Sequence, residues 1–163
     1  MSRKINKGFT TIELLVYMGI LSFLIMILST IFVSIVDVQL DSKSTSDVDQ
    51  DGRYILARLA YDFGSAQSVA SPSTPGSSSG TLQISINSIN YTYNLDGSGN
   101  LQLTNNLGTN NLNSINTTIP SITFQRIGNG GINDTIRVTF TVKSTTQRHT
   151  VPEQRTYQTT FGI

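Results

Sequence analysis

The 163-residue sequence contains no cysteine, a single histidine and few charged residues. Without cysteine the chain can form no disulfide, has no thiol nucleophile and cannot build cysteine-type zinc or iron–sulfur sites. With His149 as its only histidine, it cannot build a multi-histidine metal centre either. Charged residues make up 13% of the chain, and the net charge of +1 gives no bulk field that would attract nucleic acid. Composition therefore excludes most metal and triad chemistry, and we expect neither an enzyme nor a bound cofactor.

Charge is scarcest in a long apolar run near the N-terminus. Residues 14–36 are 23 consecutive residues without a charge, and Glu13 is the one charge in residues 9–36. As a helix the run would rise about 35 Å, enough to cross a hydrocarbon core of about 30 Å. The basic residues Arg3, Lys4 and Lys7 precede it, and acidic residues dominate the segment after it. Positive charge stays in the cytoplasm, so we expect a single pass through the cytoplasmic (inner) membrane, N-terminus inside and C-terminus outside.

A cleaved secretory signal peptide has a similar basic head, apolar run and polar body. Its apolar part usually has about 7–15 residues and is followed by a small-x-small cleavage site. The run in this chain is longer, and residues 30–36 offer no pair of small residues at the required spacing. These features favour a retained hydrophobic helix.

The pattern after the run predicts that the helix continues as an amphipathic segment over residues 37–66. Apolar residues recur there at helical spacing and form one stripe. The stripe consists of Ile55, Leu56, Leu59, Ala60 and Phe63. The first proline is Pro72, so no proline ring interrupts the helix before it.

Charge pairs and one glycine act on this segment in opposite directions. Asp49 with Arg53, and Arg58 with Asp62, are oppositely charged residues four positions apart, a spacing that stabilises a helix. Gly52 weakens the helix by about 1 kcal/mol relative to alanine. Residues 41–49 also include many β-branched and small polar residues, so the helix is least secure over residues 41–52 and more secure on either side.

After a Ser/Pro/Gly-rich linker loop at 71–80, the apolar period changes to two, which predicts an antiparallel β domain over residues 81–163. The alternation indicates five to seven strands, around residues 82–86, 89–95, 101–103, 122–126, 136–142 and 157–163. The segment DGSGN at 96–100 is expected to be a hairpin turn, and the Asn- and Thr-rich residues 104–118 an irregular loop. Each strand has one apolar face, which the helical stripe can cover, so the expected fold class is α+β.

Two loops carry oxygen ligands of the kind that suit Ca²⁺. They are residues 96–100 and 128–134, which combine Asp and Asn side chains with backbone carbonyls. Each contains only one carboxylate, so we expect turns and no metal site. His149 lies in a polar stretch, and we expect it to be solvated.

The strongest functional signal is the segment KGFTTIELL at residues 7–15. A carboxylate such as Glu13 at the start of a membrane helix is costly in lipid and usually marks a function that involves a partner. Gly8 lies where the basic head meets the apolar run. A residue without a side chain at this junction would let a protease seat the backbone.

This segment resembles the type III signal of type IV prepilins and type II secretion pseudopilins. The shared features are the basic head, Gly-Phe-Thr, a Glu four positions after the Phe, and the apolar run. The resemblance implies that a prepilin peptidase cuts between Gly8 and Phe9 and N-methylates Phe9, and that Glu13 acts in filament assembly. It implies a leader peptide of residues 1–8 and a transmembrane and filament-core helix of residues 9–36. The alternative is a plain signal anchor with a chance glutamate.

A weaker resemblance covers residues 48–63, VDQDGRYILARLAYDF, which look like the stalk of J-type minor pseudopilins and related minor pilins. A solvated amphipathic helix packed on its own sheet would explain the same stripe. Major pilins often carry a proline in the membrane run, where this chain has Thr30, and a C-terminal disulfide, which this chain cannot form. Both departures favour a minor subunit.

The expected protein is thus a pilin-like α+β subunit, whose long N-terminal helix packs by its second half on a C-terminal antiparallel sheet. The expected function is structural, as a minor pilin or pseudopilin of a type IV pilus, type II secretion or competence-type filament outside the cytoplasm. Expected partners are the prepilin peptidase, other pilin or pseudopilin subunits and the inner membrane, with DNA or exported cargo as weaker candidates. The alternative is a signal-anchored extracytoplasmic β-domain module that binds DNA, a glycan or a surface. N-methylated Phe9 at the mature N-terminus would select the filament subunit.

Overall fold

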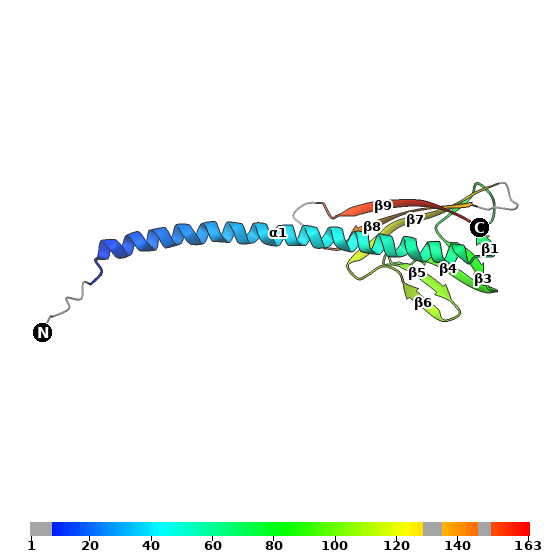
Figure 1. The fold of residues 1–163 in the computed structure, drawn as a ribbon, viewed down its shortest axis with the longest axis horizontal. Helices are drawn as coiled ribbons and strands as arrows, with labels where there is room; N and C mark the ends of the chain where they lie inside the picture. Colours follow the sequence, from blue (N-terminus) through cyan, green and yellow to red (C-terminus); the bar gives the residue numbers. More distant parts are fainter. Residues whose placement is uncertain (1–7, 129–134, 147–150) are drawn as a thin grey trace. The chain divides into compact units, whose positions relative to one another are not determined.

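The computed structural model describes residues 8–128, 135–146 and 151–163. Its elements are α1 (Thr11–Gly64), β1 (Ser68–Ser71), β2 (Ser78–Ser79), β3 (Leu82–Ile86), β4 (Ile89–Leu95), β5 (Leu101–Asn105), β6 (Gly108–Asn111), β7 (Thr117–Ile127), β8 (Thr135–Ser144) and β9 (Gln154–Gly162) (Figure 1). Contacts divide the chain into two units, Met1–Gln39 and Leu40–Ile163, and each is described by itself. The basic residues Arg3, Lys4 and Lys7, nearly all of the loop 128–134, and His149 lie outside the described residues.

Helix α1 confirms the predicted long N-terminal helix, with slightly different ends. It begins at Thr11, two residues after the expected start, and ends at Gly64, two residues before the expected end. Its last turn is closed by the backbone N–H groups of Ser65 and Ala66, which donate to carbonyls in the helix at 3.2 Å. Residues 41–52, where the helix was expected to be least secure, are helical without a break.

The described part of the β domain has nine strands in two antiparallel sheets, more than the five to seven predicted for one sheet. One sheet has the order β1-β3-β4-β5-β6, and the other has the order β2-β7-β8-β9. The DGSGN turn joins β4 to β5 as predicted. The additional strands are the short β1 and β2, which border or lie in the expected 71–80 loop, and β6. None of the three carries an apolar alternation that the sequence could reveal.

Strand β6 corrects the expectation that residues 104–118 form an irregular loop. A two-residue turn after Asn105 reverses the chain, and the Asn105 side chain accepts a 2.9 Å hydrogen bond from the Leu107 N–H. Gly108 then adopts a left-handed φ of 124°, a conformation that favours glycine. All four residues of β6 are exposed, which is why the strand has no hydrophobic signature. Strand β7 also begins inside this segment, at Thr117.

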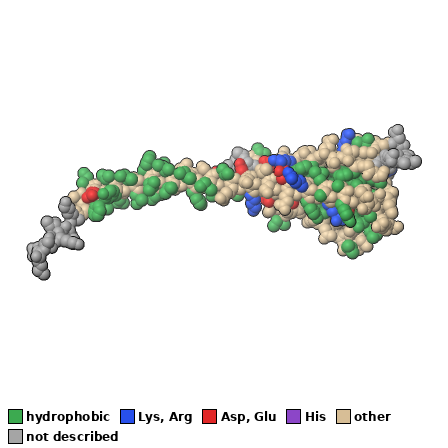
Figure 2. Space-filling model, viewed as in Figure 1, with side chains coloured by type: hydrophobic (Ala, Val, Ile, Leu, Met, Phe, Trp, Pro, Cys, Tyr) green, Lys and Arg blue, Asp and Glu red, His purple; other side chains and the backbone are tan. Residues whose placement is uncertain are grey.

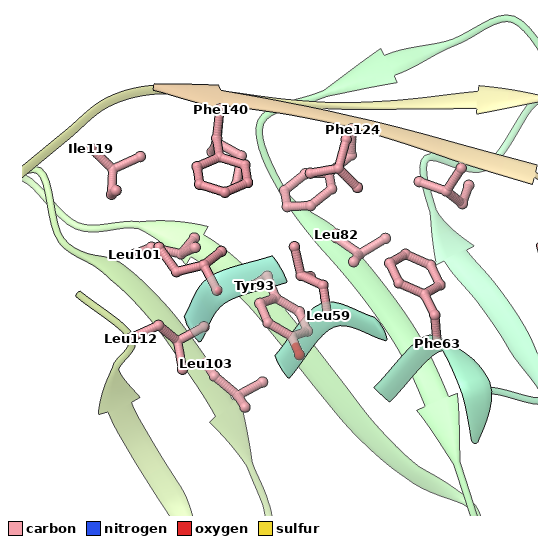
Figure 3. Close-up of a cluster of buried hydrophobic side chains, with 14 of the residues drawn as sticks. Leu59, Phe63, Leu82, Tyr93, Leu101, Leu103, Leu112, Ile119, Phe124 and Phe140 are labelled. Carbon is pink, nitrogen blue, oxygen red and sulfur yellow. The ribbon is translucent and has the colours of Figure 1, made fainter. Parts of the chain in front are cut away.

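The hydrophobic core lies between the second half of α1 and the two sheets. Figure 3 shows Leu59 and Phe63 of α1 among side chains from both sheets, namely Phe124 and Phe140 of the β2-β7-β8-β9 sheet and Leu82 and Tyr93 of the other. Every one of these side chains is buried. Full burial of a Leu or Phe side chain contributes about 1.5–3 kcal/mol, so the helix is a structural part of the domain.

The predicted apolar stripe is confirmed in most of its members. Ile55, Leu59 and Phe63 are buried, and Leu56 is partly buried against the core. Ala60 is exposed, because it lies at the border of the stripe and turns away from the sheets. The helix on sheet arrangement is α+β, as predicted, and is consistent with a pilin-like fold.

Carboxylates on α1 fasten the helix to separate parts of the β domain. Asp62 is buried and accepts hydrogen bonds from the Tyr93 hydroxyl of β4 and from Arg58 Nε, the latter at 3.0 Å. Burial, followed by the hydrogen bond to Asp62, raises the pKa of Tyr93. The Arg58–Asp62 pair was predicted, but its connection to β4 was not. Removing the Tyr93 hydroxyl would leave a buried carboxylate short of a donor, a change that typically costs about 1–3 kcal/mol.

A second helix carboxylate, Asp51, holds the connection between the two sheets. It accepts hydrogen bonds from the Ser114 N–H at 2.9 Å, from the Ser114 hydroxyl at 2.8 Å and from the Thr117 hydroxyl. Asp49 was expected to pair with Arg53, but its ion pair, at 2.6 Å, is with Arg155 of β9. A local sequence pattern cannot predict this pair, because Arg155 lies far from Asp49 in the sequence.

Gly52 has a packing role that the propensity argument missed. A Cβ atom at Gly52 would lie 2.3 Å from Tyr157 Cζ, well inside van der Waals contact. The Tyr157 hydroxyl donates to Asp49 at 3.0 Å, and burial together with this hydrogen bond raises the pKa of Tyr157. Glycine thus weakens the helix locally so that β9 can approach it closely.

Candidate functional site

The candidate site begins with the start of α1, which a threonine caps. The Thr10 hydroxyl accepts a hydrogen bond from the Glu13 N–H at 3.3 Å, and the Thr10 carbonyl accepts from the Leu14 N–H at 3.1 Å. This is one half of a capping box, in which the side chain of the N-cap residue satisfies a free N–H of the first turn. The helix therefore starts directly after Phe9 and Thr10, where the resemblance places the mature N-terminus.

The Glu13 side chain lies among aromatic groups of the same helix end. Its Oε1 accepts a hydrogen bond from the Tyr17 hydroxyl, one turn further along, at 3.2 Å. The Phe9 ring meets the Tyr17 ring edge to face, with centroids 5.9 Å apart. A negative charge in the first turn is favoured by the helix dipole. The structure thus brings the two predicted residues Phe9 and Glu13 together around Tyr17.

Gly8 precedes this cluster and is exposed. A Cβ atom built on Gly8 would have no heavy atom within 4 Å, and its backbone is not in the left-handed region. The fold of the described residues therefore makes no demand for glycine at this position. A requirement for glycine at position 8 would have to come from a molecule that acts on the chain.

The N-terminal part of α1 has the composition of a membrane-spanning helix. Among the described residues, α1 alone is long and apolar enough to cross a membrane, with a mean hydropathy of 2.6 over its most apolar window, none of which is buried. Figure 2 shows hydrophobic side chains covering this part of the helix. Large exposed apolar surface marks an interaction site for a membrane or for other proteins.

The serine and threonine hydroxyl groups within the apolar run are satisfied by the helix itself. Each donates to the carbonyl four residues earlier, at distances between 2.8 and 3.1 Å. They belong to Ser22, Ser29, Thr30 and Ser34. Such bonds are the means by which small polar residues are tolerated in lipid, where water cannot serve as a partner.

The loop at 96–100 is a turn, as expected, and its donors satisfy its one carboxylate. Asp96 accepts hydrogen bonds from the N–H groups of Asn100 and Ser98 at 2.7 and 2.8 Å, and from the Asn100 side-chain amide at 2.8 Å. These bonds, chiefly those from Asn100, hold the pKa of Asp96 below its ordinary value. Among the described residues, no group of three or more His, Cys, Asp or Glu could hold a metal ion. The other calcium candidate, at 128–134, lies almost wholly outside the described residues.

Sequence reasoning missed two contributors to the site, Thr10 and Tyr17. Both leave a trace in the sequence: Thr10 precedes Glu13 by the three-residue spacing of a capping box, and Tyr17 follows Glu13 by one turn. Neither spacing shows that these side chains lie together until the start of the helix is known.

Comparison with protein-family models, with curated proteins and with solved structures gives no match.

Proposed function

We propose that this protein is a structural subunit of an extracytoplasmic filament, a minor pilin or pseudopilin of a type IV pilus, type II secretion or competence-type system. In this proposal a prepilin peptidase removes residues 1–8 on the cytoplasmic side and methylates the new amine of Phe9. The apolar part of α1 then holds the subunit in the inner membrane, N-terminus inside, until neighbouring subunits take it into the filament. The β domain faces the outside.

The observation that carries the proposal is the order of features at the start of α1. An exposed glycine that the fold does not require comes directly before an aromatic residue, a capped helix start and a carboxylate in the first turn. The helix that follows is apolar on all sides and unburied. A plain signal anchor needs only the last of these features. The combination supports a segment that is both processed by a peptidase and packed against other helices.

The mature N-terminus tests the proposal directly. The full chain is co-expressed with a prepilin peptidase, purified from membranes and analysed by mass spectrometry. We expect a chain that begins at Phe9 and carries one additional methyl group on its amine. A chain that keeps residues 1–8 would contradict the proposal and would favour the signal-anchored binding module.

Gly8→Leu tests whether processing depends on the glycine, and Gly19→Leu is the matched control. A Cβ atom added at either position would have no heavy atom within 4 Å, so neither substitution should disturb the fold. We expect Gly8→Leu to remain a full-length, membrane-bound precursor, because a side chain at the cut site would clash with the peptidase. Gly19→Leu should be processed normally. Equal processing of both variants would rule out the proposed signal.

A further inference from the structure

Strand β6 is an exposed sheet edge that lacks most of the usual protections. Edge strands are normally guarded by charges, proline or bulges, because their free N–H and C=O groups can pair with another chain. Strand β1 has a register shift next to Ser71 and is followed by Pro72, and β2 has only two residues. Strand β9 contains Arg155 and packs its Tyr157 against α1. In contrast, β6 has no charge, and neither does any residue of the segment 97–125 around it.

The hydrogen-bond pattern shows which groups of β6 face outward. Its partner β5 pairs Leu103 with Asn110 and Thr104 with Thr109, and the Leu112 N–H donates to the Leu101 carbonyl at 2.8 Å. Hydrogen-bonded and non-hydrogen-bonded pairs alternate along an antiparallel ladder. Leu101 and Leu112 form a hydrogen-bonded pair, and Leu103 and Asn110 lie two positions along the ladder. Leu103 and Asn110 are therefore also a hydrogen-bonded pair, and the main-chain groups of Asn110 point towards β5. The N–H and C=O groups of Thr109 and Asn111 therefore point out from the sheet edge.

Two apolar side chains flank this edge. Leu107, in the turn before β6, is 86% exposed, and Ile115, after β6, is 94% exposed. They are more exposed than any other large hydrophobic side chain among the described residues. Exposed apolar groups next to free backbone donors and acceptors are the combination that strand addition uses, with main-chain bonds for affinity and side chains for specificity.

We propose that β6 pairs with β6 of a second copy of this chain, antiparallel and around a two-fold axis through Asn110. This register places Thr109 opposite Asn111 of the second copy, so the outward groups of each pair exchange both main-chain hydrogen bonds. A two-fold contact requires a self-complementary surface, and the uncharged segment 97–125 brings no like charges together. The same register brings Leu107 towards the part of the second copy that carries Ile115.

The proposed contact between the two β6 strands is short, so its affinity is expected to be low. A strand of four residues buries far less than the roughly 1,200–2,000 Å² of a stable interface, so the pairing is transient. It joins two subunits through their β domains and does not depend on filament assembly. Failure of N-terminal processing would leave it intact, so the two proposals can fail separately.

The lack of native cysteine allows a direct test in the full chain. In this pairing the two Asn110 residues form a non-hydrogen-bonded pair, whose Cα atoms are about 4.5 Å apart, within the range that a disulfide can bridge. Asn110→Cys is compared with Asn90→Cys, a residue that is also exposed but lies on β4, an inner strand of the same sheet. After mild oxidation of membranes, we expect about tenfold more disulfide-linked dimer from Asn110→Cys than from Asn90→Cys. Equal yields, or an Asn110→Cys adduct with another protein and no dimer, would overturn the proposal.

A second pair of variants separates strand pairing from random collision. Thr109→Pro removes an outward N–H but no main-chain bond to β5, so proline is compatible with this edge position. Thr109→Pro and Thr109→Val both lose the 2.8 Å hydrogen bond between the Thr109 and Thr104 hydroxyls, so the two variants differ in the N–H. Added to Asn110→Cys, it should reduce the dimer to the level of Asn90→Cys. Thr109→Val keeps the N–H and should leave the dimer unchanged. If both substitutions have the same effect while the thermal unfolding of the domain stays unaltered, the main-chain pairing is refuted.

Discussion

Helix α1 has two parts that differ in how their apolar side chains are covered and in how their polar groups find hydrogen-bond partners. Over residues 11–39 its apolar side chains are exposed all round, and its serine hydroxyl groups bond to the carbonyls of their own helix. Over residues 40–64 the buried apolar side chains form one narrow stripe, which consists of Val48, Ile55, Leu59 and Phe63. There the polar side chains reach far along the sequence, as Asp51 does to Thr117 and Asp62 to Tyr93.

The difference shows what each part is built to contact. In the first part the polar groups are satisfied within the helix, so no other segment of the chain has to cover this part. Its outer surface can contact lipid or other helices. Where carboxylates and a glycine are fitted to particular partners on the strands, the helix belongs to its own domain. The first part is therefore suited to a membrane or to contacts with other molecules, whereas the second makes contacts within its own domain.

Truncation provides the strongest test of this division. The full chain should require detergent, whereas a fragment that starts at Leu40 should be soluble and folded, because it keeps the buried stripe and all three carboxylate contacts. A fragment that starts at residue 66 exposes the core between the sheets and should aggregate. Size-exclusion chromatography and circular dichroism of the two fragments distinguish these outcomes. A monomeric, well-folded 66–163 fragment would show that the helix is dispensable to the β domain.

Glu13 is the one charge in residues 9–36, and its loss should have the next largest effect. Cleavage after Gly8 would create a charged amine on Phe9, and in a bundle of apolar helices both the amine and the carboxylate need partners. Glu13→Ala should still be inserted and cleaved, but poorly recruited by partner subunits. An unpaired charge that is fully buried costs about 3–5 kcal/mol. Recruitment is measured by co-purification of the variant with its partner subunits from membranes.

Tyr17→Phe is the control for that experiment. It removes the hydroxyl that donates to Glu13 and keeps the ring that contacts Phe9. If the carboxylate acts between subunits, Tyr17→Phe should be recruited nearly as well as wild type. Unchanged recovery of Glu13→Ala would mean that the carboxylate is not an assembly contact and is solvated at the level of the lipid headgroups.

Gly52 tests the other part of α1, where the helix is fitted to its own domain. Gly52→Ala should raise helix propensity by about 1 kcal/mol, but its Cβ would collide with the Tyr157 ring. Overpacking typically costs about 1–3 kcal/mol, so we expect a net loss of stability in urea unfolding of the fragment from Leu40 onward. Gly64→Ala is the control, since its Cβ would meet no heavy atom within 4 Å. A Gly52→Ala fragment as stable as wild type would show that Tyr157 can move aside at little cost.

The sequence predicted those features that repeat along it. The apolar run, the stripe through Ile55, Leu59 and Phe63, and the alternation in the longer strands are periodic, so helix, strands and fold class could be derived. Strand β6 could not, because an edge strand that is exposed on all sides has no apolar alternation. The contacts of Asp51 and Asp49 could not be derived either, since their partners are decided only when helix and sheets meet. In the candidate site, Gly8, Phe9 and Glu13 could be named from their pattern, whereas Tyr17 needed the helix geometry.

The smallest expected effect lies in the unit Leu40–Ile163, at the turn around Asp96. Hydrogen bonds, chiefly from Asn100, hold the pKa of Asp96 below its ordinary value, so the folded state favours the carboxylate. The stabilisation is therefore complete above the unfolded pKa of about 4 and is lost as the pH falls through the lower folded value. Asp96→Asn keeps an acceptor oxygen but no longer titrates. The difference in urea midpoint between the wild-type fragment and Asp96→Asn should favour wild type at neutral pH and shrink below about pH 4, while the other carboxylates titrate alike in both. A difference that stays constant across this range would show that the turn is held by its backbone and not by the charge of Asp96.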